Sequence, residues 1–376
     1  MNFIRKIFLM ILAFSVITSL SLTLTGCPSA PSTKSVEVIS ETTEEELTDK
    51  TTEEGVTEEE VEEATKEEIT RLTEPPIAKL MLPKITEVSE YDITHTITLV
   101  NDGPGIATHI LLHVSLIRDI EPYQKVVSME IMPQGFETIT DEYDNVYAEF
   151  EFANVASGET LNIEIYYKVT VNALDFNISK CDCSLPAIFI DPELNIESDA
   201  EQIISLANEL AKSKVTACEK VKAFYNYVGD NISYTSNPDD INEGALLTLE
   251  DSSGDCTDFT DSLIALCRAA GIPARFIEGV TCCTNGHYIA HENKHNRLEV
   301  YIPCVGWVPM DPTWGRFQAN RETYFAGTTA DYIIVGQGRN RDILKGYYYF
   351  HYNYWWGVES TTVSNQEEWE IVKVEE

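Results

Sequence analysis

Hydrophobic and polar residues alternate through much of the first half of the chain, from about residue 76 to residue 171. Within residues 91–99, the odd-numbered positions are mostly apolar and the even-numbered positions are polar. The same period of two returns in residues 106–116, 146–152 and 161–171. Alternation of this kind is typical of half-buried strands, and several such strands separated by turns predict an antiparallel β-sandwich. We therefore assign residues 76–172 to a β-sandwich domain.

The hydrophobic period changes after a connector at residues 173–198. Apolar residues recur at helical spacing in residues 203–211 and 217–228, which predicts two helices. A third helix is expected to begin at Cys256 and to end before Gly271, because Pro273 prevents its continuation. Strands are predicted over residues 274–280, 295–302 and 307–311. We assign residues 199–345 to one α+β domain.

The C-terminal segment, residues 346–376, is rich in aromatic residues. Rings crowd residues 347–356, and residues 368–374 alternate like a last strand. We expect these strands to close the sheet of the preceding domain, with one face buried. The alternative interpretation is an exposed aromatic surface that binds a glycan or a peptide.

The first 27 residues are organised like an export signal. Arg5 and Lys6 precede an almost wholly apolar run that ends at Leu24-Thr25-Gly26-Cys27. These four residues look like a lipobox, the site at which a bacterial-type lipoprotein is cut and its new N-terminal cysteine is lipidated. We expect Cys27 to anchor the chain on the extracytoplasmic face of the cell membrane. The alternative is an ordinary signal peptide with a chance cysteine.

Acidic residues dominate the segment that follows, residues 28–75. Between Glu41 and Leu72, 14 acidic residues are set against three basic ones, and the whole chain has a net charge of −36. A segment of this composition cannot bury enough apolar surface to fold alone, so we expect a disordered, extended tether. A tail that binds cations or a partner is the alternative. The acidic balance also argues against a nucleic-acid partner.

The cysteines indicate an oxidising compartment without fixing their pairing. Nine are present, and seven remain once Cys27 is assigned to lipid and Cys256 to chemistry. An exported protein can form disulfides among these seven, but the sequence leaves the connectivity open. We expect no metal site, because neither Cys181-Asp182-Cys183 nor Cys282-Cys283 has the spacing of a zinc site. Cys267 lies on the apolar helix face and is expected to be buried.

Three residues could act together as a nucleophilic site. Cys256 stands in the first turn of the third helix, where free N–H groups and the helix dipole favour a thiolate. His295 and Asp311 fall on two strands that a short turn joins, so an imidazole and a carboxylate can lie side by side. A thiolate attacks carbonyl carbon, an imidazole carries the proton and a carboxylate orients the imidazole. These roles together predict acyl transfer.

The segments around these residues resemble the transglutaminase-like superfamily, whose core has a papain-like Cys-His-Asp fold. The resemblance runs from about residue 200 to residue 345. It rests on Gly254-Asp255-Cys256-Thr257-Asp258-Phe259, on His295 with Glu299-Val300-Tyr301, and on Gly306-Trp307-Val308-Pro309-Met310-Asp311-Pro312-Thr313. The chain departs from the family at Arg297, where members often carry tryptophan. The preceding segment also supplies His287 and His291.

The resemblance implies that Cys256 is the nucleophile, that His295 carries the proton and that Asp311 orients His295. It implies a thioester intermediate. We expect no cofactor, although the sequence leaves calcium dependence open. Tyr234 and Trp307 are candidates for lining the substrate cleft, although they could equally be core aromatics.

The function we expect is an extracytoplasmic, lipid-anchored cysteine hydrolase that acts on peptide or isopeptide bonds of a protein or peptide substrate at the cell surface. The first alternative is a transglutaminase that crosslinks proteins, because an amine can replace water at the thioester. The second is a non-catalytic module that binds peptide or glycan.

Overall fold

The computed structural model describes residues 82–179, 181, 183–235, 243–282, 294–346, 350–358 and 360–375, and the backbone of residues 287–289. The predicted export signal, residues 1–27 with Cys27, and the predicted tether, residues 28–75, lie outside the described residues. Within the described ranges, no helix combines the length and the hydropathy needed to cross a membrane.

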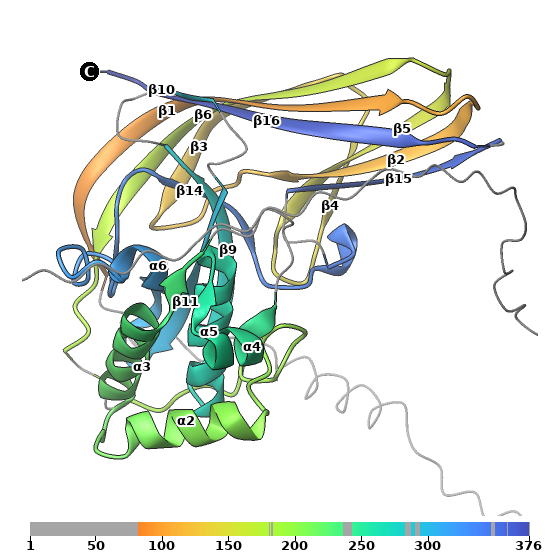
Figure 1. The fold of residues 1–376 in the computed structure, drawn as a ribbon. Coiled ribbons are helices and arrows are strands. Elements are labelled where there is room, and N and C mark those ends of the chain that lie inside the picture. Colours follow the sequence, from red (N-terminus) through yellow and green to blue (C-terminus); the bar gives the residue numbers. More distant parts are fainter. Residues whose placement is uncertain are drawn as a thin grey trace, which may run out of the picture. The chain divides into compact units, whose positions relative to one another are not determined.

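The larger sheet of the β-sandwich has six strands (Figure 1). Its long strands are β1 (Lys84–Asn101), β6 (Thr160–Asp175) and β16 (Val363–Lys373), and β3 (Gln124–Met132) pairs with β6. Short strands β10 (His287–Ile289) and β13 (Gly327–Thr328) complete its edges. Alternation in β1 has the predicted effect: Tyr91, Ile93, Ile97 and Leu99 are all buried.

The second sheet has the strand order β15-β2-β5-β4, and all its pairings are antiparallel. Its strands are β15 (His351–Gly357), β2 (Ala107–Leu116), β5 (Val146–Val155) and β4 (Glu137–Thr140). Apolar side chains of both sheets form one core, in which the ring of His95 stacks on Trp369 with the centroids 3.7 Å apart. The predicted antiparallel β-sandwich is confirmed.

The C-terminal strands join the sandwich, which corrects the prediction that residues 346–376 close the sheet of the preceding domain. β15 pairs with β2 and β16 pairs with β1. The physical reason is that β16 buries Val363, Trp369 and Ile371 in the sandwich core. The sandwich is therefore assembled from strands on both sides of the α+β segment. The alternative interpretation of this segment is an exposed aromatic surface. Trp355 and Trp356 are exposed, whereas Phe350 is buried.

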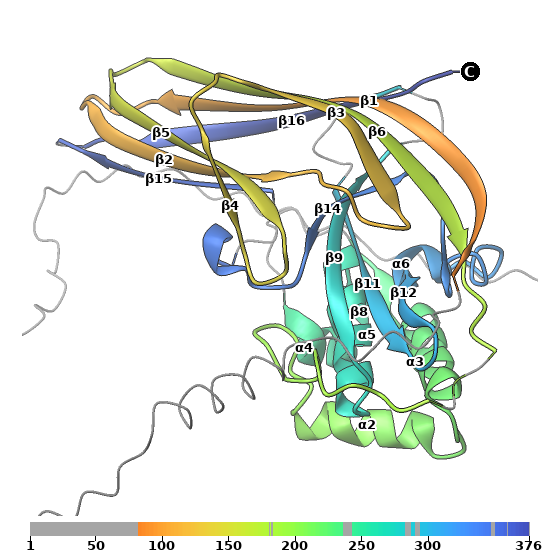
Figure 2. The ribbon, with the colours of Figure 1, turned by 180° about the vertical axis from the view of Figure 1, so that it is seen from behind.

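A second core surrounds a four-stranded antiparallel sheet of order β12-β11-β9-β14. The strands are β9 (Ala274–Thr281), β11 (Lys294–Ile302), β12 (Gly306–Met310) and β14 (Tyr332–Gln337). Helix α5 (Cys256–Ala269) packs on this sheet through Phe259, Leu263 and Leu266. Helices α2 (Glu201–Ala211), α3 (Ala217–Asn231) and α4 (Gly244–Asp251) gather around α5 (Figures 1 and 2). The α+β prediction is confirmed.

Two amide side chains of the sandwich bond the outer edge of β14. Gln124 Oε1 accepts from the backbone N–H of Ile334 at 2.7 Å, and Gln124 Nε2 donates to the Ile334 carbonyl at 2.8 Å. Asn145 bonds Gln337 in the same way, at 2.9 Å and 2.7 Å. An open strand edge is a site for unwanted pairing, so these amides protect the edge. The two amides also connect the sandwich to the sheet that contains β14. Apolar side chains of that sheet and of the sandwich share a core.

Two disulfides pair four of the cysteines that the structure describes. Cys181 is joined to Cys218 at the start of α3, and Cys183 is joined to Cys304 in the turn between β11 and β12. The connector is thereby fixed to both a helix and the sheet. Cys267 is fully buried in the core of the α+β domain, as predicted.

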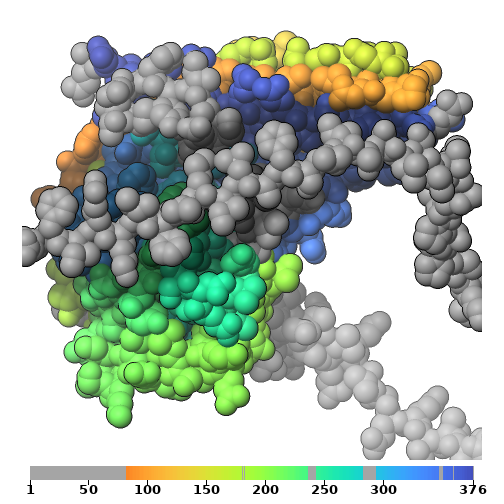
Figure 3. Space-filling model, in the orientation of Figure 1, coloured from red at the N-terminus to blue at the C-terminus, as the bar shows by residue number. Residues whose placement is uncertain are grey.

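Side chains of α2 and α3 form the green surface in Figure 3.

Candidate active site

Cys256 is the first residue of α5 and is half-buried. Asp255 caps the helix, because its side chain accepts from the N–H groups of Thr257 at 2.8 Å and Asp258 at 3.4 Å. Asp258 returns the contact by accepting from the N–H of Asp255 at 2.9 Å. Among the described residues, no hydrogen bond uses the N–H of Cys256. That N–H group is available to an oxyanion beside the thiol.

His295 lies at the start of β11, and its imidazole is held between two groups. Its Nε2 atom is 2.6 Å from Oδ2 of Asp311, and Cys256 is near enough for its charge to act on the imidazole. The residue is only 7% exposed. The structure thus brings together the three residues that the sequence predicted to form a site.

The electrostatics of the site favour a charged imidazole. Burial by itself lowers the pKa of His295, but the charge and hydrogen bond of Asp311, followed by those of Cys256, outweigh burial. The pKa of His295 rises as a result to about 10. An imidazolium with this pKa stays protonated at neutral pH and can act as the counter-ion of a thiolate. The arrangement therefore supplies a protonated imidazole as a proton donor in the resting site.

Asp311 is positioned by the turn that follows β12. It caps the short helix α6 (Pro312–Gly315), with Oδ1 accepting from the N–H of Trp314 at 2.9 Å. Its backbone is also fixed, because its carbonyl accepts from the hydroxyl of Tyr225 at 3.2 Å. Gly315 permits this contact, since an added Cβ would collide with the Tyr225 hydroxyl. The carboxylate consequently has little freedom to turn away from His295.

Two aromatic rings flank His295, and sequence reasoning did not identify either. Tyr332 of β14 meets the imidazole edge-on, with centroids 6.0 Å apart, and Trp314 lies tilted at the same distance. The Tyr332 hydroxyl donates to the His295 carbonyl at 2.9 Å. Gly279, the β9 partner of His295, makes room for this ring, because an added Cβ would lie 2.6 Å from its Cζ atom. No motif marked Tyr332, whereas Trp314 directly follows Asp311-Pro312-Thr313.

Arg297, the departure from the family pattern, packs behind Tyr332. It is 3% exposed, and its guanidinium carbon lies 3.8 Å from the centroid of the Tyr332 ring. It also hydrogen-bonds the hydroxyl of Thr328. A cation over a buried ring stabilises the ring's position. Arg297 therefore supports the wall of the site and does not itself face the thiol.

The two predicted cleft residues have different surroundings. Tyr234, in the two-residue strand β7 (Ser233–Tyr234), is 45% exposed and pairs with Gly254, two residues before Cys256. Burial raises its pKa, and the charge at Cys256 raises it further. Trp307 instead contacts Phe189, with ring centroids 5.4 Å apart, and Arg275, whose guanidinium carbon is 4.3 Å from its ring centroid. None of the ring contacts described for Trp307 involves the three site residues.

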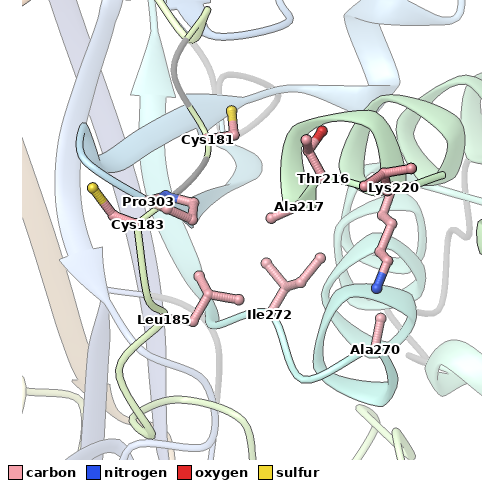
Figure 4. Close-up of a pocket in the computed structure, with 10 residues that line it drawn as sticks. Cys181, Cys183, Leu185, Thr216, Ala217, Lys220, Ala270, Ile272 and Pro303 are labelled. Atoms are coloured by element: carbon pink, nitrogen blue, oxygen red, sulfur yellow. The ribbon is translucent and has the colours of Figure 1, made fainter.

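A separate cavity of about 410 Å³ lies near the other end of α5. Its lining includes Cys181, Cys183, Thr216, Lys220, Ala270 and Ile272 (Figure 4). Helix α5 has 14 residues, so at 1.5 Å per residue roughly 20 Å separates this cavity from Cys256. The cavity is thus distinct from the thiol site. Within the described ranges, no group of three or more His, Cys, Asp or Glu side chains is arranged to hold a metal.

Comparison with known proteins agrees with this architecture. Residues 204–312 match the family model of the transglutaminase-like superfamily, so the chain contains a transglutaminase-like domain. All three site residues fall within the match.

Two curated relatives are similar over part of the chain. The uncharacterised protein YebA of Bacillus subtilis is 29% identical over 168 residues, which are 39% of this chain and 21% of that protein. An uncharacterised protein of Haemophilus influenzae is 36% identical over 83 residues, 18% of this chain and 22% of its own length. The chain thus spans about a fifth of each curated relative.

One solved structure shares most of the fold. The crystal structure of "a Putative Cysteine Protease from Cytophaga hutchinsonii" superposes with a TM-score of 0.55 at 18% identity. The superposition covers 78% of this chain and 94% of that one. At this identity the likeness shows the fold alone.

Proposed function

We propose that this protein is a cysteine acyl-transfer enzyme that hydrolyses peptide or isopeptide bonds, with Cys256, His295 and Asp311 as its catalytic triad. One observation carries the proposal: a buried imidazole is held between a thiol at a helix start and a carboxylate. Nε2 of His295 is 2.6 Å from Oδ2 of Asp311, and the charge at Cys256 raises the pKa of the same ring. Nucleophile, proton carrier and orienting group are thus present in the order that acyl transfer requires.

The reaction begins with the attack of the Cys256 thiolate on the carbonyl carbon. A bond forms between sulfur and carbon, and the carbonyl oxygen takes the negative charge beside the N–H of Cys256. The imidazolium of His295 then gives its proton to the leaving amine as the carbon–nitrogen bond breaks, which leaves a thioester. Water attacks the thioester, His295 takes the proton of that water, and the acid and the thiolate are released. Asp311 holds the imidazole in one orientation throughout.

The proposal is tested by separating hydrolysis from amine transfer. Casein is incubated with the protein and a fluorescent amine, and peptide cleavage and fluorescence incorporation are measured in parallel. We expect cleavage that Cys256→Ser abolishes and that Cys282→Ser, a change at a buried cysteine of the sandwich core, does not. Incorporation without cleavage would support the crosslinking alternative. The absence of both on a broad protein panel would support the binding module.

We also propose that the enzyme is exported and lipid-anchored through Cys27, with its substrate a protein or peptide at the cell surface. The sequence Leu24-Thr25-Gly26-Cys27 supports the anchor. The two disulfides support an oxidising compartment. Expression in a bacterium with a clickable fatty acid tests the anchor, because Cys27→Ser should lose the label. Equal labelling of the variant and the wild-type protein would contradict it.

A further inference from the structure

An arginine in the turn after Asp311 lies between two exposed aromatic rings. The guanidinium carbon of Arg316 is 4.7 Å from the ring centroid of Tyr234 and 4.2 Å from that of Phe317. Tyr234 is 45% exposed and Phe317 is 47% exposed. Contacts of a guanidinium with two rings are attractive and restrict its motion. Arg316 is therefore oriented in advance, at a position that solvent can reach.

The charge of Arg316 has no ion-pair partner among the described residues. Its Nη1 atom donates to the carbonyl of Thr313, which leaves its other N–H groups for another acceptor. Asp311 is the nearby carboxylate, but it uses Oδ2 for His295 and Oδ1 for the N–H of Trp314. This is unusual for a chain with 62 acidic and 26 basic residues, where counter-ions are plentiful. Partial burial lowers the pKa of Arg316, yet a guanidinium remains charged in proteins.

The same turn that carries the triad carboxylate also carries this cation. Arg316 immediately follows α6, which Asp311 caps. On its other side, Arg316 packs on Tyr234, whose backbone pairs with Gly254, two residues before Cys256. The Tyr234 ring also contacts Phe259 in the first turn of α5, with ring centroids 6.4 Å apart. Tyr234 thus connects the guanidinium to the end of α5 that carries the nucleophile.

We propose that Arg316 is a carboxylate-binding subsite, which selects acyl donors that carry a free carboxylate close to the carbonyl under attack. The substrate class is then an acidic peptide or isopeptide. A guanidinium recognises a carboxylate through two parallel N–H···O bonds, and the exposed rings of Tyr234, Phe317 and Trp314 contact the apolar part of the same residue. This inference rests on the proposed function of Cys256 as the nucleophile.

The test compares charged and neutral alkylating agents at the thiol. Iodoacetate and iodoacetamide differ only in carboxylate against amide, and 3-iodopropionate with its amide repeats the comparison at a longer reach. The second-order rate constant for alkylation of Cys256 is measured for each reagent at neutral pH, with peptide mapping to identify the cysteine. The measured quantity is the ratio of the carboxylate rate to the amide rate.

We expect Arg316→Gln to lower this ratio about fivefold for at least one reagent length, as loss of a partly exposed charged contact predicts. Arg316→Lys should keep most of the ratio, because it keeps the charge. Lys212→Gln removes an exposed cation of α2's C-terminal end and should change nothing. Raising the salt concentration should lower the wild-type ratio, a measurement that does not depend on any variant folding.

The outcomes distinguish this inference from the proposed function. If Arg316→Gln keeps the wild-type ratio at both lengths, the subsite is overturned, even though rapid alkylation of Cys256 would leave the proposed function standing. If Arg316→Gln slows carboxylate and amide reagents equally, Arg316 acts on the thiol and the subsite is again overturned. If wild-type Cys256 reacts no faster than a thiol of the unfolded chain, the proposed function fails first and the subsite fails with it.

Discussion

Replacing Asp311 by asparagine removes one charge from the site and changes little else. Asparagine has nearly the same shape, and its Oδ1 atom can still accept from the N–H of Trp314, so the cap of α6 is retained. The change leaves burial, which lowers the pKa of His295, opposed by Cys256 alone. We expect the imidazole to become neutral at pH 7 and the thiolate at Cys256 to lose its counter-ion.

The geometry sets the size of this effect. His295 is 7% exposed, Asp311 is 3% exposed, and their polar atoms are 2.6 Å apart. Two unit charges at such range in a partly shielded site attract by about 4 kcal/mol. This energy changes the ratio of charged to neutral imidazole about 10³-fold. The amide of asparagine retains part of the hydrogen bond. We therefore expect the rate of Cys256 alkylation by iodoacetamide at pH 7 to fall about 10²-fold.

The assay measures the alkylation rate of Cys256 from pH 5.5 to pH 9, with mass spectrometry to identify the modified cysteine. Asp92→Asn is the matched control, because Asp92 forms an exposed ion pair with Lys168 in the sandwich. Circular dichroism and thermal unfolding show whether each variant is folded. A folded Asp311→Asn protein whose alkylation rate stays within threefold of wild type across this range would refute the ion-pair reasoning.

Four further results are expected. Hydrolysis should persist above neutral pH and decline as the pH rises through about 10, where the raised pKa of His295 predicts loss of the proton donor; a decline near pH 7 would contradict this. The same protonation contributes stability in full below the ordinary pKa of 6.5, and that contribution is lost as the pH rises through about 10. Gln124→Ala leaves the N–H and carbonyl of Ile334 without partners and should lower the free energy of unfolding by about 2–4 kcal/mol. Urea denaturation measures this loss, with Gln366→Ala as the control variant. A loss no larger than that of Gln366→Ala would contradict the prediction. Replacing both Cys183 and Cys304 by serine opens a link of sequence separation 121 and should cost about 4–5 kcal/mol, with an unchanged melting temperature as the contrary result.

The helix at Cys256 and the strands around it could be predicted because their signals are local. An apolar face, Gly271 and Pro273 define α5 within a short stretch of chain, and the observed helix Cys256–Ala269 agrees with that pattern. Gly271 has a φ of +70°, as a residue just after a helix end requires. The hairpin of β11 and β12 is equally local, since a turn of three residues aligns the two strands.

The partner of the C-terminal strands could not be predicted in the same way. Alternation in residues 363–373 shows which side chains turn inward, but it does not distinguish one sheet from another. β16 lies beside β1, more than 250 residues away in sequence, as in the pairing of His95 with Trp369. Which sheet β16 joins depends on which sheet has a free edge for it. In the α+β domain the amides of Gln124 and Asn145 already bond the edge of β14.

The surroundings of the triad depended on contacts of the same long range. Tyr332 reaches His295 from β14, and Arg297 became a support for that ring rather than part of the cleft. Trp307, predicted as a cleft candidate, contacts Phe189 of the connector. Aromatic residues and arginines carry no local signal of which neighbour they will meet.

The sequence by itself determined the elements, the α+β character of residues 199–345 and the three residues proposed for chemistry, because hydrophobic period, caps and turns act over a few residues. The tertiary structure alone decided which sheet each distant strand joined, which cysteines paired, and that Arg316 packs on Tyr234 with no counter-ion among the described residues. These outcomes depend on packing between segments far apart in the chain, where burial and charge are set by all the neighbours together.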